Sequence, residues 1–126
     1  MPSKVRLKRI SDRFQQELSE MLVLNQINDP RLDQVTITEV KIDREFAYAD
    51  IYVSAFEGSE RSKSILAGLE SASGFIRKNL AEKVDIRSMP RLRFHWDPTP
   101  ERADRIERLL SEIRETPPVE KDDDSE

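Results

Sequence analysis

The apolar residues of this chain switch repeatedly between the spacing of a helix and that of a strand, and the order of those switches limits the possible folds. Residues 5–24 have apolar positions three and four apart, which predicts a helix that ends before Pro30. Residues 35–42 are rich in β-branched side chains and change phase near Glu39, which predicts a strand with a bulge or bend. Residues 46–55 alternate, and the short segment between the two runs predicts an antiparallel hairpin.

Helical spacing then continues through Val84, with Ser59 as the expected N-cap. Gly74 lies in the middle of this region. A glycine inside a helix costs about 1 kcal/mol relative to alanine. We therefore predict two helices that meet near residues 72–74.

A short strand and a last helix complete the pattern. In the strand, Trp96 lies on the side with Leu92 and Phe94, and we expect it in the core. The last helix is predicted to start with Thr99 as N-cap. Its expected buried side consists of Ala103, Ile106, Leu110 and Ile113.

The charge is unevenly distributed along the 126 residues, which suffice for one compact domain. Residues 115–126 carry six acids and one lysine, a net −5, so the total of −4 leaves +1 for residues 1–114. Residues 1–13 and residues 77–93 each carry a net +4. We predict a domain over 1–114 followed by a disordered acidic tail over 115–126. The two basic clusters favour a positioned, salt-sensitive contact with phosphates.

Several classes of function have little support in the sequence. There is no cysteine, His95 is the only histidine, and three glycines form no phosphate-binding loop. The acids of the predicted tail lack the rigidity that a metal site requires. The sequence has no apolar run long enough for a membrane span or a signal peptide. We therefore expect a cytoplasmic, non-catalytic protein without cofactor or metal.

The predicted order helix-strand-strand-helix-helix-strand matches the type II KH arrangement, with a helix appended. Short motifs along the chain narrow the match: Arg9, Asp29-Pro30-Arg31-Leu32, Val35-Thr36-Ile37-Thr38, Ala49-Asp50-Ile51-Tyr52-Val53-Ser54, Ala72-Ser73-Gly74-Phe75-Ile76-Arg77, Leu80, Arg87-Ser88-Met89-Pro90-Arg91-Leu92-Arg93-Phe94 and Asp97. In this order and spacing, the sequence resembles the ribosome-binding factor A family across nearly the whole predicted domain.

The resemblance implies an α+β fold in which the GxxG loop of ordinary KH domains is replaced by an interrupted helix bearing AxG, here residues 72–74. It also implies a partner, the immature 30S subunit and its 16S rRNA during late maturation and rRNA processing, and a link to growth in the cold. No catalytic activity, small-molecule substrate or membrane is implied, and a monomer is the default.

The candidate RNA-binding residues fall into three groups. They are Arg6, Lys8, Arg9 and Arg13 in the first helix; Ala72, Ser73 and Gly74 at the helix break, with Arg77 and Lys78 after it; and Arg87, Arg91 and Arg93 around the last strand. Each group has a plain structural alternative. Gly74 alternatively permits only close packing or a bend, and the arginines of the first helix alternatively form a solvated face.

Two further expectations concern the outer face of the sheet and Arg31. If the second and third strands share a sheet, one outer face combines Tyr48, Tyr52, Arg91, Arg93 and His95. Such a face can stack nucleobases, although tyrosines are also common in strands for other reasons. Arg31 is expected to cap or brace the loop after the first helix.

The rival functions are a KH-type RNA regulator acting away from the ribosome and a module that docks an acidic protein.

Overall fold

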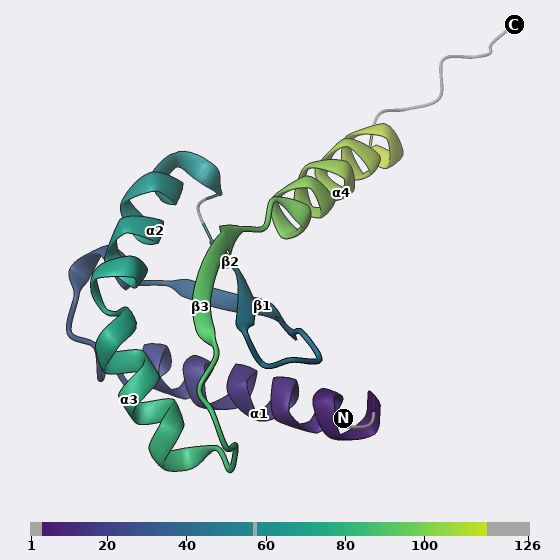
Figure 1. The fold of residues 1–126 in the computed structure, drawn as a ribbon. Coiled ribbons are helices and arrows are strands. Elements are labelled where there is room, and N and C mark those ends of the chain that lie inside the picture. Colours follow the sequence, from purple (N-terminus) through teal and green to yellow (C-terminus); the bar gives the residue numbers. More distant parts are fainter. Residues whose placement is uncertain (1–3, 57, 116–126) are drawn as a thin grey trace, which may run out of the picture.

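The three strands form one sheet, and the first three helices cover one of its faces (Figure 1). The structure is a computed structural model that describes residues 4–56 and 58–115. In chain order, its elements are α1 (Lys4–Val23), η1 (Pro30–Leu32), β1 (Val35–Ile42), β2 (Tyr48–Ala55), η2 (Ser59–Arg61), α2 (Ser62–Ser71), α3 (Ser73–Lys83), β3 (Arg91–Trp96) and α4 (Thr99–Glu115). The predicted α+β class and the KH-like element order with an appended helix are confirmed. The predicted acidic tail lies outside the described residues, except that α4 ends at Glu115.

The sheet has the order β1-β2-β3 and mixes the two kinds of pairing. β1 and β2 form the predicted antiparallel hairpin, and their register shifts between Ile37 and Glu39, which confirms the predicted bulge. β2 and β3 are parallel. Parallel neighbours need a long crossover connection, and α2 and α3 provide it. The register of this pair places Asp50 opposite Arg93 and Tyr52 opposite His95.

One core lies between the sheet and the three helices. α1 contributes Phe14, Leu18 and Met21, each fully buried, because they recur at helical spacing on the side facing the sheet. The core also contains Ile37, Val40, Ala49, Ile51, Val53, Ile65, Leu69, Ile76, Leu80 and Leu92. Trp96 is only partly buried and packs at the margin of this cluster. Trp96 therefore lies on the predicted side of β3, but it is less deeply buried than predicted.

Two predicted starts differ from the structure. The second helical region opens with η2, so α2 begins at Ser62, and the cap of η2 is Gly58 and not Ser59. Gly58 has φ +85°, a backbone conformation that glycine adopts without strain. β2 begins at Tyr48 because Phe46 has φ +57° and belongs to the turn.

The prediction for the last helix is wrong in one respect. α4 forms as expected, but it projects away from the sheet (Figure 1). Its apolar side chains are exposed, with 58% for Ile106, 45% for Leu110 and 69% for Ile113. The spacing therefore identified an apolar side of the helix that no described element covers.

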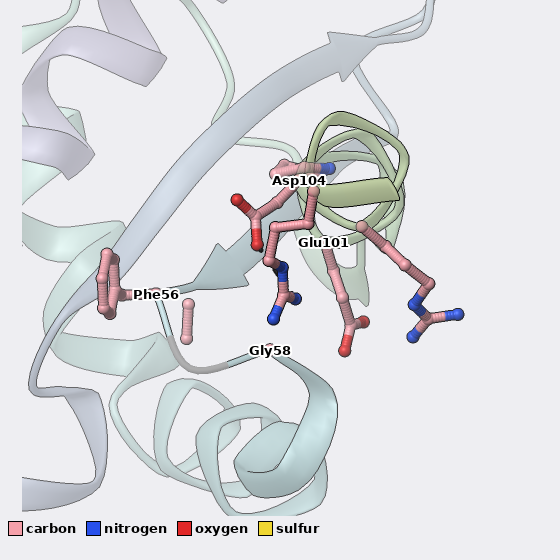
Figure 2. A pocket seen from close by; sticks show the side chains of 8 residues that line it. Phe56, Gly58, Glu101 and Asp104 are labelled. Carbon is pink, nitrogen blue, oxygen red and sulfur yellow. Dashed lines mark ion pairs between the residues drawn. The ribbon is translucent and has the colours of Figure 1, made fainter. Parts of the chain in front are cut away.

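The junction of α4 with the body is built around Glu101. Its Oε2 atom accepts a hydrogen bond from the Ser59 amide at 3.0 Å and from the Ser59 hydroxyl at 3.3 Å. A Cβ at Gly58 would lie 2.5 Å from the same oxygen, so another residue there would have to displace the Glu101 carboxylate and adopt a strained positive φ. Beside these residues is an open hollow of about 560 Å³, lined also by Arg105, Arg108 and the exposed Phe56 (Figure 2). Residues 4–56 and 58–115 contain no helix long and apolar enough to cross a membrane.

Candidate nucleic-acid interface

The helix break lies where the sequence predicted it. α2 ends at Ser71 and α3 begins at Ser73, and Ala72 between them leaves the helical conformation with φ −90° and ψ 1°. The carbonyl of Ala72 accepts a hydrogen bond from the Ile76 amide at 2.9 Å and so starts α3. Residues 72–74 therefore form the first turn of a separate helix and not a continuous rod.

Gly74 is exposed, and a Cβ built on it meets no atom within 4 Å. The packing alternative for this glycine is therefore wrong. Gly68 is the residue that needs to be small, because its Cβ would lie 3.1 Å from Leu32 Cδ2 and 3.3 Å from Asp29 Oδ2. At Gly74 the space beside the backbone is open on the solvent side.

Exposed cations follow the break. Arg77 and Lys78 lie on α3, and Arg87 and Arg91 lie in and after the loop that leads to β3. Arg77 Nη2 donates to the Met89 carbonyl at 3.2 Å, which ties α3 to this loop. Arg77 and Lys78 thus lie one turn after residues 72–74, and Arg77 has a structural contact as well, whereas Arg87 and Arg91 lie beyond the other end of α3.

The cations of α1 differ in the ion pairs that they form. Arg13 Nη2 lies 2.9 Å from Glu17 Oε2, and Lys83 Nζ of α3 lies 3.7 Å from Glu17 Oε1. The Glu17 side chain is only 6% exposed, so this acid joins α1 to α3. The sequence analysis missed this contact, although the i, i+4 spacing of Arg13 and Glu17 was a signal for it. Lys8 is paired with Asp12 at 2.9 Å on the surface.

Arg9 is exposed in the middle of α1, and Arg6 is exposed one turn earlier. Arg13 is held by a buried acid and Lys8 by a surface acid, so Arg9 is the member of the predicted group that we select for testing contact with a partner. The predicted stripe is thus divided into a structural part and an exposed part.

The outer face of the sheet brings together the side chains that the sequence proposed. Arg93 Cζ lies 4.0 Å from the centre of the Tyr48 ring, and the rings of Tyr52 and His95 stack at 5.0 Å with 28° between their planes. Asp50 lies between these pairs. It accepts from Arg93 Nε at 2.8 Å and Nη2 at 3.0 Å, and its Oδ1 lies 2.8 Å from His95 Nε2.

The two hydrogen bonds from Arg93 lower the pKa of Asp50, and the His95 contact adds to this, while partial burial opposes it. Asp50 is therefore a carboxylate that fixes two cationic or aromatic neighbours at once. Alternation along β2 puts Asp50 on the same side as Tyr48 and Tyr52, but its role as the organising acid requires the parallel β2–β3 register.

The comparisons with known proteins fit this geometry. The family model described as ribosome-binding factor A matches residues 6–110. The chain belongs to that family. The ribosome-binding factor A of Dictyoglomus thermophilum is 42% identical over 109 residues, which cover 86% of this chain and 90% of that protein. The one of Hahella chejuensis is 37% identical over 115 residues, which cover 86% and 84%.

The fold agrees with a solved member of the family. The crystal structure of ribosome-binding factor A from Thermus thermophilus matches with a TM-score of 0.64 and 26% identity, over 71% of this chain and 93% of that one. This supports the KH-like description of the fold.

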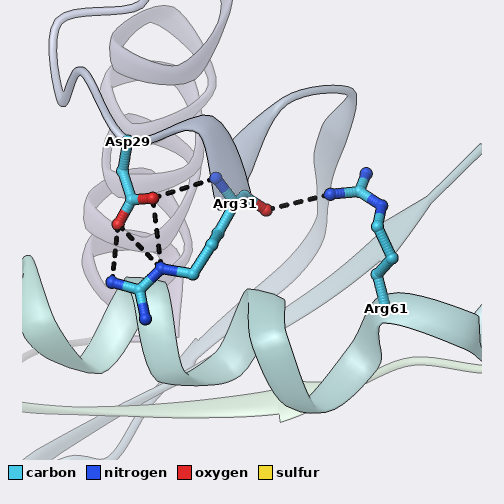
Figure 3. A network of polar contacts seen from close by, with 3 residues as sticks. All are labelled: Asp29, Arg31 and Arg61. Carbon is cyan, nitrogen blue, oxygen red and sulfur yellow. Dashed lines mark hydrogen bonds and ion pairs between the residues drawn. The ribbon is translucent and has the colours of Figure 1, made fainter.

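One of the family-like motifs proves to be structural. Asp29 Oδ1 accepts from the Arg31 amide at 2.9 Å, and its carboxylate is paired with the Arg31 guanidinium at 2.8 Å (Figure 3). These hydrogen bonds hold the pKa of Asp29 below its usual value. Arg61 then donates to the carbonyls of Arg31 and Asp33 at 3.1 and 2.8 Å. The expectation that Arg31 caps or braces the loop is confirmed.

The described residues offer little support for a metal site or for a nucleophile activated by a base. Within them, no three histidine, aspartate or glutamate side chains gather where a metal ion could bind. His95 lies beside Asp50 and Tyr52, and neither of these contacts supplies a serine or threonine hydroxyl. These contacts of His95 do not pair a nucleophile with a base.

Proposed function

We propose that this chain is a non-catalytic assembly factor that binds the immature small ribosomal subunit and its 16S rRNA during late maturation and rRNA processing. Its membership of the ribosome-binding factor A family supports the ribosomal partner. The proposal includes action in the cytoplasm, as a monomer, with the largest effect on growth in the cold.

The observation that carries the RNA contact is the open backbone at Gly74. No packing contact in the described fold needs a glycine there, since its Cβ would touch no neighbour and its φ is not positive. A partner that approaches the first turn of α3 closely would need it, because a side chain would stand in the way. Amide groups at a helix start and the nearby Arg77 and Lys78 favour phosphate as that partner.

The mechanism is selective binding. A factor that binds one arrangement of an rRNA region more tightly than another raises the population of the first and leaves when that arrangement is lost. No covalent step is required, and the cations of α1 and α3 supply the affinity. Their contribution falls with salt, since each neutralised phosphate releases counterions.

Co-sedimentation with purified immature small subunits over a series of salt concentrations tests the proposal. We expect the protein to migrate with the subunits at low salt. In the variant Arg9→Gln/Lys78→Gln, the slope of log affinity against log salt should become shallower by about 0.7–0.9 for each phosphate that the variant no longer neutralises. The matched control is Arg102→Gln/Arg114→Gln, which removes the same charge from α4 and should behave like the native protein.

One outcome would reject the proposal, and another would reject the interface at α1 and α3. A native protein that stays at the top of a low-salt gradient does not bind the subunit, which would favour an RNA or protein partner elsewhere. Equal slopes for the interface variant and the α4 control would mean that α1 and α3 do not face the RNA.

A further inference from the structure

The outer face of the sheet carries a second, different surface. The helices α1, α2 and α3 cover the face that bears Ala49, Ile51 and Val53, so the alternate residues of β2 and β3 point to the other side. On that side the side chains of Arg93 and His95 are 49% and 42% exposed, and Tyr48 is 38% exposed. No described helix packs over them (Figure 1).

The rings on this face are already aligned. The Tyr52 ring stacks with His95, and Lys41 Nζ is 5.6 Å from the centre of the same ring. Arg93 lies over Tyr48, and Asp50 holds Arg93 and His95 in place from the same strand as the tyrosines. Such planes are fixed before a ligand arrives, so little side-chain entropy remains to be lost on binding.

The charges indicate which part of an RNA this face suits. The Asp50 carboxylate neutralises Arg93 at short range and repels a phosphate placed there. Aromatic rings and a guanidinium plane are instead the surfaces on which unpaired nucleobases stack. Arg91 is exposed on the edge strand, in register with Tyr48, and provides the complement to the phosphates that link stacked nucleobases.

We propose that the outer face of β2 and β3 is a stacking platform for unpaired nucleobases of RNA, built from Tyr48, Tyr52, Arg93 and His95 and held in shape by Asp50. It rests on the proposed function for its RNA partner and adds a base-reading side to the phosphate-binding side at α1 and α3. The two surfaces lie on different sides of the sheet, so one molecule contacts RNA through both.

Fluorescence anisotropy with the full chain tests the platform. The probes are a labelled single-stranded RNA of about eight nucleotides, within the usual site size of such surfaces, and the same backbone with abasic positions. Both probes carry equal phosphate charge. Stacking of one nucleobase contributes about 1–3 kcal/mol, so the native protein should bind the RNA with nucleobases at least about 5-fold more tightly than the abasic one.

Two variants separate the platform from the helix side. Tyr48→Leu/Tyr52→Leu should lose the preference for nucleobases while its salt dependence stays the same. Arg9→Gln/Lys78→Gln should weaken binding of both probes equally. Thermal unfolding checks that each variant is folded. If the double tyrosine variant fails to fold, Tyr48→Leu alone, at an exposed residue outside the core, should show a reduced preference.

The proposal is overturned if the native protein binds both probes equally, or if a folded tyrosine variant keeps the full preference. Failure of the proposed function looks different. A preference for nucleobases without co-sedimentation with subunits leaves the platform standing and rejects the ribosomal role. Co-sedimentation without that preference rejects the platform alone.

Discussion

Helices α1 and α4 have the same kind of apolar spacing, but only α1 is covered. Phe14, Leu18 and Met21 of α1 are fully buried against the sheet and α3, whereas Ile106 and Ile113 of α4 are more than half exposed. The difference arises from where each helix lies. α1 lies across the sheet, while α4 leaves the end of β3 and points away from it (Figure 1). Periodicity therefore identifies the apolar side of a helix but not the surface that covers it.

Two glycines show the same contrast at a smaller scale. Gly68 of α2 lies against η1, where a Cβ would be in tight contact with Leu32 and Asp29, whereas Gly74 of α3 faces open space. Both occur inside predicted helical regions, and the sequence drew attention only to Gly74. Neighbouring side chains crowd the site at Gly68, whereas no neighbour restricts the site at Gly74.

Substitution of a covered and an uncovered apolar residue should give the largest difference. Phe14→Ala is expected to lower the free energy of unfolding by about 3–5 kcal/mol, because it leaves a cavity in the core. Ile106→Ala should change it by less than about 0.5 kcal/mol, as is usual for surface positions. Equilibrium unfolding in urea measures both. A large loss for Ile106→Ala would show that α4 is covered in solution, by the body or by a second copy.

The two glycines give the next test with one substitution, leucine, at both sites. Gly68→Leu should destabilise by about 1–3 kcal/mol, because the side chain must displace Leu32 and Asp29. Gly74→Leu should be neutral or stabilising by up to about 1 kcal/mol, because it replaces a helical glycine in open space. The same variant should bind small subunits more weakly. Native-like subunit binding by folded Gly74→Leu would remove the argument for close approach at the helix break.

Most of the fold followed from local patterns, and the larger failures concern contacts between separate elements. The bulge near Glu39, the hairpin and the break at residues 72–74 all depend on neighbours in sequence, and all are confirmed. The exposure of α4, the contact of Lys83 with Glu17, and the role of Asp50 depend on how separate elements meet. For α4, no pattern within the helix could reveal that the described chain supplies no surface to cover it.

The candidate site shows the same limit. The sequence predicted which residues share the outer face if β2 and β3 are neighbours. The parallel pairing of these strands meets that condition. It did not distinguish cations that face solvent from those that hold the fold together. Contacts such as Arg77 with Met89 decide that difference, and they appear only when the loop before β3 is in place.

The free energy of unfolding should depend more strongly on acid pH through Asp50 in the sheet than through Asp104 in α4. The pKa of Asp50 is lower in the folded chain than in the unfolded one, so the stability it contributes is present above about pH 3.9 and is lost as the pH falls through its folded value. Asp50→Asn should reduce stability at pH 7 by about 1 kcal/mol, as for a partly exposed ion pair. Its loss of stability below pH 4 should also be less steep.

Urea unfolding at a series of pH values measures this effect. Asp97, whose pKa is lowered by the Thr38 hydroxyl and the Thr99 amide, contributes with the same sign in both proteins. The difference between native and Asp50→Asn therefore isolates Asp50. As a control, Asp104→Asn, at an exposed pair with Arg108, should change stability at pH 7 by less than about 0.5 kcal/mol. Parallel acid profiles for the native protein and Asp50→Asn would contradict the proposed role of Asp50.

The smallest expected effect concerns the contact that holds α4. Glu101→Ala removes the acceptor of the Ser59 amide, and loss of a capping hydrogen bond costs about 0.5–1 kcal/mol. Amide hydrogen exchange at Ser59 should become faster, while exchange in β2 should stay nearly unchanged. Glu107→Ala, elsewhere on α4, is the control and should leave Ser59 exchange as it is.

The outcome also shows whether Glu101 is the main contact that attaches α4 to the rest of the fold. If Glu101 is its main attachment, the Ala variant loosens α4 without loosening the core, since α4 buries few of its own apolar side chains. Protection at Ser59 that survives the substitution would mean that other contacts hold α4 in solution. The contrast between α1 and α4 would then be smaller than their exposures imply, because part of the apolar side of α4 would have to be covered.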